Sequence, residues 1–174
     1  IQWSVKPPLA AAGLPHAPRA VPVSPGTPEV LASTLIVQPW NNREVLERTI
    51  RQRHHEIAAI ITEPLMANCG CVEAQAGYLQ FLRDITKEYG IVLIFDEVIT
   101  GFRLALGGAQ EYYGVTPDLT TMAKAIAGGF PLSAVGGKRE IMELAARNQV
   151  PYLGTYNTST VVMAAARATI AGLA

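Results

Sequence analysis

Two short apolar runs with an amphipathic stretch between them constrain the fold of this chain more than any other feature. Residues 58–62 and 91–95 are each typical of a buried strand, and 119–123 is a weaker third candidate. Apolar residues recur at the spacing of one helix face over 78–89, and Gly90 stands where such a helix ends. Strand, helix and strand in this order predict an α/β fold, with a mostly parallel sheet between helices.

Polar residues follow these predicted strands directly. Glu63 follows the first run, the pair Asp96-Glu97 follows the second, and Lys124 follows the third. In open parallel sheets, ligands bind beyond the carboxyl ends of the strands. The sequence therefore predicts a functional site at this edge.

Asp96 and Lys124 carry the chemistry of the predicted site. A carboxylate behind a buried strand needs a cationic or hydrogen-bonding partner, because an unpaired buried charge is costly. Lys124 lies among alanines and glycines, and apolar surroundings favour the neutral amine that imine formation requires. Taken singly, the acidic pair is more typical of a helix cap or surface pair, and the lysine of a surface residue. Together, at strand ends, they favour a functional interpretation.

A nucleotide hydrolase is an alternative, with Asp96-Glu97 as a metal-binding acidic pair. That hypothesis needs a phosphate loop of the form G-x-x-x-x-G-K-[ST]. The only Gly-Lys is Gly137-Lys138, where Leu132 replaces the first glycine and Arg139 replaces the final Ser or Thr. These residues therefore do not form a phosphate loop. A non-catalytic piece is the other open alternative.

A longer motif connects these positions to a known family. Residues 94–103 read Ile-Phe-Asp-Glu-Val-Ile-Thr-Gly-Phe-Arg, residues 59–64 precede them as Ala-Ile-Ile-Thr-Glu-Pro, and 124–131 contain Gly-Gly-Phe-Pro. This set resembles the class III aminotransferases that depend on pyridoxal phosphate (PLP), and within them the glutamate-1-semialdehyde 2,1-aminomutase branch. The resemblance is most specific over 56–140. It implies the large domain of a fold-type I PLP-dependent transferase, which transfers or migrates an amino group.

The resemblance also implies a role for each matching residue. Lys124 is implied to form the Schiff base with PLP and to move the proton during catalysis. Asp96 is implied to pair with the cofactor's ring nitrogen, and Val98 to pack on one face of the ring. Glu63 is implied to orient the aspartate region. Thr155 is implied to bind the cofactor phosphate in the neighbouring subunit's site.

The chain is expected to be part of a longer protein that includes the family's N-terminal part and small domain. Within it, residues 1–40 contain most of the twelve prolines and are expected to form a surface segment of the same domain, whereas 41–174 form the PLP-binding core. After Thr155 the sequence Tyr-Asn-Thr-Ser-Thr replaces the Ser-Gly-Asn-Pro of aminomutases, which leaves aminomutase and transaminase both open.

The charge balance and the cysteines limit which binding partners and which cellular compartment are expected. Fourteen basic residues offset fourteen acidic ones, which argues against nucleic acid or a membrane surface as the main partner. Cys69 and Cys71 lack further metal-ligand residues at a suitable spacing, so we predict no metal site and a reducing, cytoplasmic compartment. The resemblance implies a homodimer, with cofactor sites at its interface, that acts on a small amino acid or amine.

Overall fold

A computed structural model describes residue 8 and residues 10–174. The start of the predicted proline-rich segment, residues 1–7 and 9, lies outside the described residues. The described chain forms two compact units, one up to His54 and the other from His55 to Ala174. Within the described part, no helix is both long enough and apolar enough to cross a lipid bilayer.

The first unit ends in a helix with one buried apolar face. Its elements in order are β1 (Gly13–Leu14), β2 (Ala17–Pro18), the 3-10 turn η1 (Glu29–Thr34) and α1 (Arg43–Arg53). Val45, Leu46 and Ile50 of α1 are buried. The helix begins after Asn42, whose side-chain oxygen accepts a hydrogen bond from the Val45 amide at 3.0 Å. Asn41, one residue earlier, has a φ of 62° and lies outside the helix.

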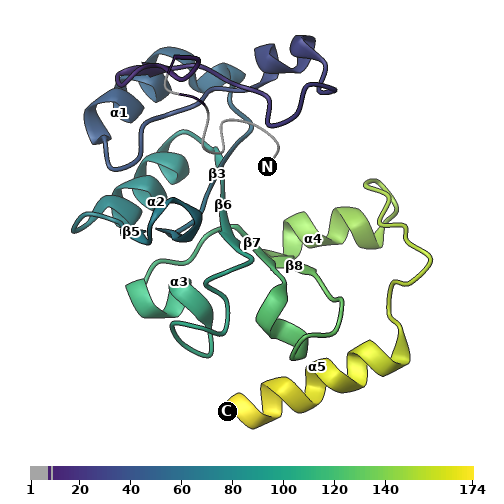
Figure 1. Cartoon of the computed structure of the whole chain (residues 1–174). Helices are drawn as coiled ribbons and strands as arrows, with labels where there is room; N and C mark the ends of the chain where they lie inside the picture. The colour runs from purple at the N-terminus through teal and green to yellow at the C-terminus, as the bar shows by residue number, and fades with distance from the viewer. Residues whose placement is uncertain (1–7, 9) are drawn as a thin grey trace. The chain divides into compact units, whose positions relative to one another are not determined.

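A four-stranded sheet with the order β3-β6-β7-β8 organises the second unit (Figure 1). Its strands are β3 (Ala59–Thr62), β6 (Val92–Glu97), β7 (Leu119–Met122) and β8 (Ala134–Gly137). The pairs β3·β6 and β6·β7 are parallel, as predicted, and β8 joins the edge antiparallel to β7. The three predicted strands are confirmed, with bounds shifted by at most two residues.

Helices and short turns connect these strands. In order they are η2 (His54–Glu56), the hairpin β4 (Leu65–Met66) and β5 (Val72–Glu73) with η3 (Ala67–Cys69) between its strands, α2 (Tyr78–Glu88), α3 (Gly108–Tyr113), η4 (Lys124–Ala127), α4 (Arg139–Ala146) and α5 (Thr160–Leu173). The predicted helix stop is confirmed, since α2 ends at Glu88 and Gly90 has a left-handed φ of 67°. Figure 1 shows α5 separated from α4 by an extended segment.

Strand β6 has one buried face and one half-buried face. Leu93, Phe95 and Glu97 are buried, whereas Ile94 and Asp96 between them are half-buried. Successive side chains of a strand point to opposite faces, so Asp96 and Glu97 lie on different sides of the sheet. The run at 91–95 predicts a buried strand, and the structure buries only one of its two faces fully.

Asp118 ties the strands together at the amino-terminal edge of β7. Its carboxylate accepts hydrogen bonds from the Leu93 amide at 2.7 Å and from Arg83 Nη2 at 3.0 Å, and pairs with Lys138 Nζ at 2.6 Å. Burial by itself raises the pKa of Asp118, but these three donors outweigh it and hold the pKa at about 2. The contacts of Asp118 therefore fix β6, β7 and β8 at the end of the sheet opposite to the predicted site.

Candidate active site

The carboxyl ends of the three parallel strands meet at one edge of the sheet. Phe95 pairs with Thr62 of β3 on one side and with Thr120 of β7 on the other. Glu63, the first residue after β3, therefore lies at the level of Asp96, the last residue but one of β6. Lys124 begins η4 two residues after the end of β7. The structure thus brings these three predicted residues to a common edge.

Asp96 is held in place by two donors that both use the same oxygen. Its Oδ1 accepts from the Val98 amide at 3.1 Å and from Thr121 Oγ1, on the neighbouring strand, at 3.3 Å. Neither bond uses Oδ2. A half-buried carboxylate with one oxygen fixed and the other available is suited to accept an N–H from a bound molecule. The sequence analysis did not identify Thr121, although its pairing opposite Asp96 follows from the strand register.

Lys124 begins a turn whose far end is buried. The residue has a φ of 49° and its side chain is exposed, whereas Ile126 and Ala127 pack with Ala166 of α5. The burial that the flanking alanines suggested for Lys124 is not found among the described residues, because the chain turns and buries the following two residues instead. The amine therefore extends from an anchored turn at the edge of the sheet.

The remaining predicted residues lie on loops. Val98 is half-buried in the turn after β6 and donates its amide to Asp96. Glu63 is half-buried, and its Oε2 accepts from the Ala67 amide at 3.1 Å, so its contact goes to its own loop rather than to Asp96. Thr155 is exposed in the segment between α4 and α5. Glu63, Asp96 and Lys124 thus lie at one end of the sheet. Thr155 is far from them in the sequence, and its side chain is exposed.

Glu97 does not act as the second member of an acidic pair with Asp96. Only 1% of Glu97 is exposed, and its carboxylate accepts from Thr100 Oγ1 at 3.1 Å and from the Gln110 amide at 3.2 Å. The two carboxylates lie on opposite faces of β6, so they cannot share a metal ion. The hypothesis of Asp96-Glu97 as a metal-binding pair is therefore wrong. Among the described residues, no group of three or more His, Cys, Asp or Glu side chains is arranged to hold a metal.

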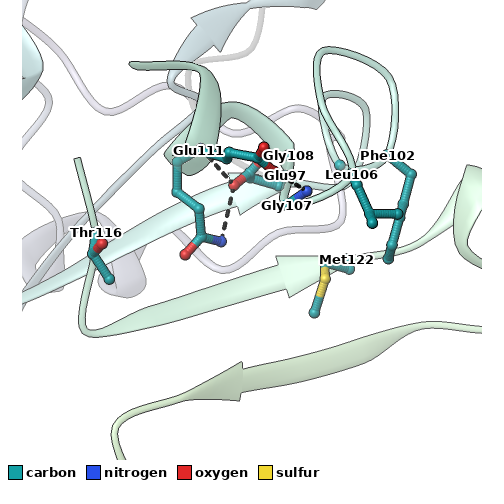
Figure 2. Close-up of a pocket in the computed structure, with 10 residues that line it drawn as sticks. Glu97, Phe102, Leu106, Gly107, Gly108, Glu111, Thr116 and Met122 are labelled. Atoms are coloured by element: carbon teal, nitrogen blue, oxygen red, sulfur yellow. Dashed lines mark hydrogen bonds between the residues drawn. The ribbon is translucent and has the colours of Figure 1, made fainter. Parts of the chain in front are cut away.

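A pocket of about 490 Å³ lies on the side of Glu97, not on that of Asp96 (Figure 2). Figure 2 shows Phe102, Leu106 and Met122 on one side of it, and Glu97 beside the start of α3. Neither Asp96 nor Lys124 lines this pocket. The pocket is therefore distinct from the edge where the predicted site residues meet.

Comparison with known proteins gives a consistent family. Residues 10–174 match the family model for aminotransferase class III. Two similar relatives are both described as glutamate-1-semialdehyde 2,1-aminomutase. The one from Desulfotalea psychrophila is 52% identical over 151 residues, and the one from Methanothermobacter thermautotrophicus is 51% identical over 150 residues. Each alignment covers 86% of this chain but only 35% and 36% of the relative, so the chain spans about a third of their length.

Solved structures agree with the sequence relatives. An omega-transaminase from Sphaerobacter thermophilus superposes with a TM-score of 0.86 at 41% identity, over 99% of this chain and 39% of that one. A transaminase with PLP bound superposes with a TM-score of 0.81 at 30% identity, over 87% of this chain and 36% of that one. The predicted α/β fold with a mostly parallel sheet is confirmed by these neighbours and by the strand pairing.

Proposed function

Because this chain belongs to the class III aminotransferase family, we propose that it forms the lysine-bearing core of a PLP-dependent enzyme that transfers or migrates an amino group. The observation that carries the proposal is the position of Asp96 and Lys124. Asp96 lies at the carboxyl end of β6, Lys124 follows the adjacent parallel strand β7, and Asp96 is oriented by Thr121 and by the backbone amide of Val98. The domain proposal is that 1–40 and 41–174 belong to one fold-type I large domain.

The residues at the edge fit the chemistry of PLP. When bound, the cofactor supplies an aldehyde that takes an amine and a protonated ring that draws electrons from the substrate. Lys124 is suited to hold it covalently through Nζ, because this amine is exposed and starts an anchored turn. Asp96 is suited to accept the ring N–H through Oδ2 and so to keep that nitrogen protonated. When not bonded to the cofactor, Lys124 Nζ would be able to carry a proton.

Three further residues complete the proposed site. Val98 would pack on one face of the cofactor ring, next to the Asp96 carboxylate that its amide already contacts. Glu63 would support this region through the loop that its carboxylate holds at Ala67. Thr155 would bind the cofactor phosphate in the site of a second subunit.

We propose that the active form is a homodimer. The segment around Thr155 exposes large apolar side chains, which is typical of a surface covered by a partner. Tyr156 is 88% exposed and Leu153 is 90% exposed. A partner subunit over this segment would bury both. The substrate is proposed to be a small amino acid or amine, and the compartment cytoplasmic.

Reductive trapping tests the cofactor proposal. Full-length protein loaded with PLP is treated with borohydride, which fixes the cofactor to its lysine, and the adduct is located by peptide mass spectrometry. We expect the adduct on Lys124. The matched control is Lys87→Ala, which removes an exposed lysine on α2 and leaves trapping unchanged, whereas Lys124→Ala abolishes it. An adduct on Lys138 or Lys87, or none at all, would refute the proposal.

The same preparation separates the two candidate reactions. A transaminase needs an amino donor and a separate keto acceptor, whereas an aminomutase converts one substrate without an acceptor. Single amino acids and amines are therefore incubated with and without a keto acid, and the products are followed by mass spectrometry. The aminomutase relatives favour turnover of glutamate-1-semialdehyde without acceptor, and the transaminase neighbours favour acceptor dependence.

Mixing two inactive variants tests whether Thr155 acts across a dimer. Thr155→Ala and Lys124→Ala subunits are dissociated, mixed and reassembled. If Thr155 serves the partner's site, each mixed dimer has one site with both residues intact, and random reassembly restores about a quarter of wild-type activity. If Thr155 acts within its own subunit, each mixed site lacks one residue and mixing restores nothing.

A further inference from the structure

Glu97 is more buried than its neighbour Asp96 and lies behind it. Only 1% of Glu97 is exposed, whereas Asp96 is half-buried on the opposite face of β6. A fully buried carboxylate is rarely tolerated unless donors surround it. Glu97 lies on the opposite face of β6 from Asp96, the residue proposed to contact the cofactor, so the groups that bind its carboxylate bear on the position of Asp96.

Four donors converge on the Glu97 carboxylate, two on each oxygen. Oε2 accepts from the Ala109 amide and from Thr100 Oγ1, and Oε1 accepts from the Gln110 amide and from Gln110 Nε2. Figure 2 shows Glu97 against the start of α3, with Gly107 and Gly108 beside it. A Cβ at Gly108 would collide with the carboxylate, so a glycine there allows the close approach.

The network continues from Glu97 to β7, the strand that precedes Lys124. Gln110 Nε2 also donates to Thr120 Oγ1 on β7 at 3.3 Å. Thr120 and Thr121 are adjacent on β7, so their side chains lie on opposite faces. Behind the sheet, Glu97, Gln110 and Thr120 connect β6 to β7; in front of it, Thr121 connects to Asp96 at 3.3 Å. The ends of the two strands are therefore linked on both faces.

We infer that Glu97 is a positioning residue. Through Gln110 and Thr120 it fixes the end of β6 against β7, and thereby holds the Asp96 carboxylate in register with the turn that presents Lys124. The inference rests on the proposed function, because the position of Asp96 matters to PLP only if PLP binds there. The rival interpretation is that Glu97 only caps α3 and supports the fold.

Glu97→Gln is the sharpest perturbation, because it keeps the size and shape of the side chain. The amide nitrogen would replace either Oε1 or Oε2, and each oxygen faces two donors. Whichever way the amide turns, a backbone N–H, that of Ala109 or that of Gln110, meets an N–H₂ group that cannot accept from it, and the side chain of Thr100 or Gln110 must reorient. The matched control is Glu111→Gln on α3, the helix whose first amides bind Glu97. Glu111 is exposed and accepts from the Gly107 amide, so this change removes the same charge without touching the buried network.

The test measures the dissociation constant for PLP by absorbance titration of full-length apoprotein. We expect Glu97→Gln to weaken PLP binding about tenfold, the lower end of what the loss of an orienting partner behind a ligand costs at metal sites. Glu111→Gln is expected to bind like wild type. A Glu97→Gln protein with wild-type affinity would overturn the inference.

A double-mutant cycle separates positioning from general support. If Glu97 acts through Asp96, then Glu97→Gln adds no further loss of PLP affinity in an Asp96→Asn background. If Glu97 only supports the fold, the two losses are additive, and the inference is wrong. Failure of the proposed function itself looks different: wild type would not bind PLP, or Asp96→Asn alone would leave the affinity unchanged.

A second variant covers the case in which Glu97→Gln does not fold. Thr120→Val keeps the shape of a buried side chain (5% exposed) but removes the acceptor for Gln110. It is expected to weaken PLP binding in the same direction and by a smaller factor, again only while Asp96 is present. An unchanged affinity, or a loss that persists with Asp96→Asn, would overturn the inference.

Discussion

Asp118→Asn is the perturbation whose effect the structure allows to be worked out most fully. Asp118 is 4% exposed, and its carboxylate accepts from Arg83, Lys138 and the Leu93 amide. A pKa of about 2 in place of 3.8 means that folding stabilises the charged form by about 2 kcal/mol. The asparagine also leaves the Arg83 guanidinium, whose side chain is 16% exposed, without its anion. We therefore expect a total loss of about 3 kcal/mol at pH 7.

The pH dependence of that loss identifies its cause. The native pKa of Asp118 lies below the unfolded value, so the stabilisation is fully present above about pH 4 and disappears as the pH falls towards 2. About half of the 2 kcal/mol is already lost at pH 3. In Asp118→Asn, position 118 has no carboxylate to protonate. The stability gap between wild type and Asp118→Asn should therefore shrink by about 1 kcal/mol between pH 7 and pH 3.

Urea unfolding followed by far-ultraviolet circular dichroism at both pH values measures the gap. Glu47→Gln is the control, because Glu47 also pairs with an arginine, Arg51, but both side chains are largely exposed (41% and 59%). That pair is expected to contribute less than about 1 kcal/mol. If the gap for Asp118→Asn is the same at pH 3 and pH 7, ion pairing is not what holds the three strands, and the reasoning is refuted.

Three further changes test the packing that supports the site, each by urea unfolding. Phe95→Ala empties a fully buried position in β6 and should cost about 3–5 kcal/mol; a loss below about 1 kcal/mol would contradict the burial. Gly128→Ala should destabilise more than Gly90→Ala, since both glycines have a left-handed φ but only the Cβ at 128 would collide with Thr169; equal losses would exclude the collision. Asn42→Ala should cost about 1 kcal/mol through its helix cap, and no change would mean that water replaces the cap.

The strands and their common edge could be predicted from the sequence because local patterns determine them. The apolar run before Asp96 is long enough to specify a strand, and the stripe from 78 to 89 is long enough to specify the returning helix. The parallel-sheet rule then places Glu63 and Lys124 near Asp96. The roles of these residues stay predictions until the cofactor experiments are done.

Contacts between distant segments could not be predicted. Strand β8 has the sequence Ala-Val-Gly-Gly, which lacks a strand pattern, and it forms because Gly137 lets the backbone pass close to Asp118. The hydrogen bond from Arg83 to Asp118 spans 35 positions and has no local signature. Lys124 has apolar neighbours in sequence but is exposed, because packing against α5 buries Ile126 and Ala127 instead.

The dipeptide Asp96-Glu97 shows how an element's periodicity assigns different roles to similar residues. The sequence alone leaves both shared metal binding and separate roles open for the pair. On a strand, one residue must face forward and the other backward. Asp96 receives two donors on Oδ1 and none of them on Oδ2, whereas Glu97 receives two donors on each oxygen. A carboxylate with unused acceptor capacity can bind a ligand, and one without it can only hold the protein. The different roles of Asp96 and Glu97 therefore follow from the alternation of side chains along β6. For this reason Glu97→Gln and Asp96→Asn are most informative when they are measured together.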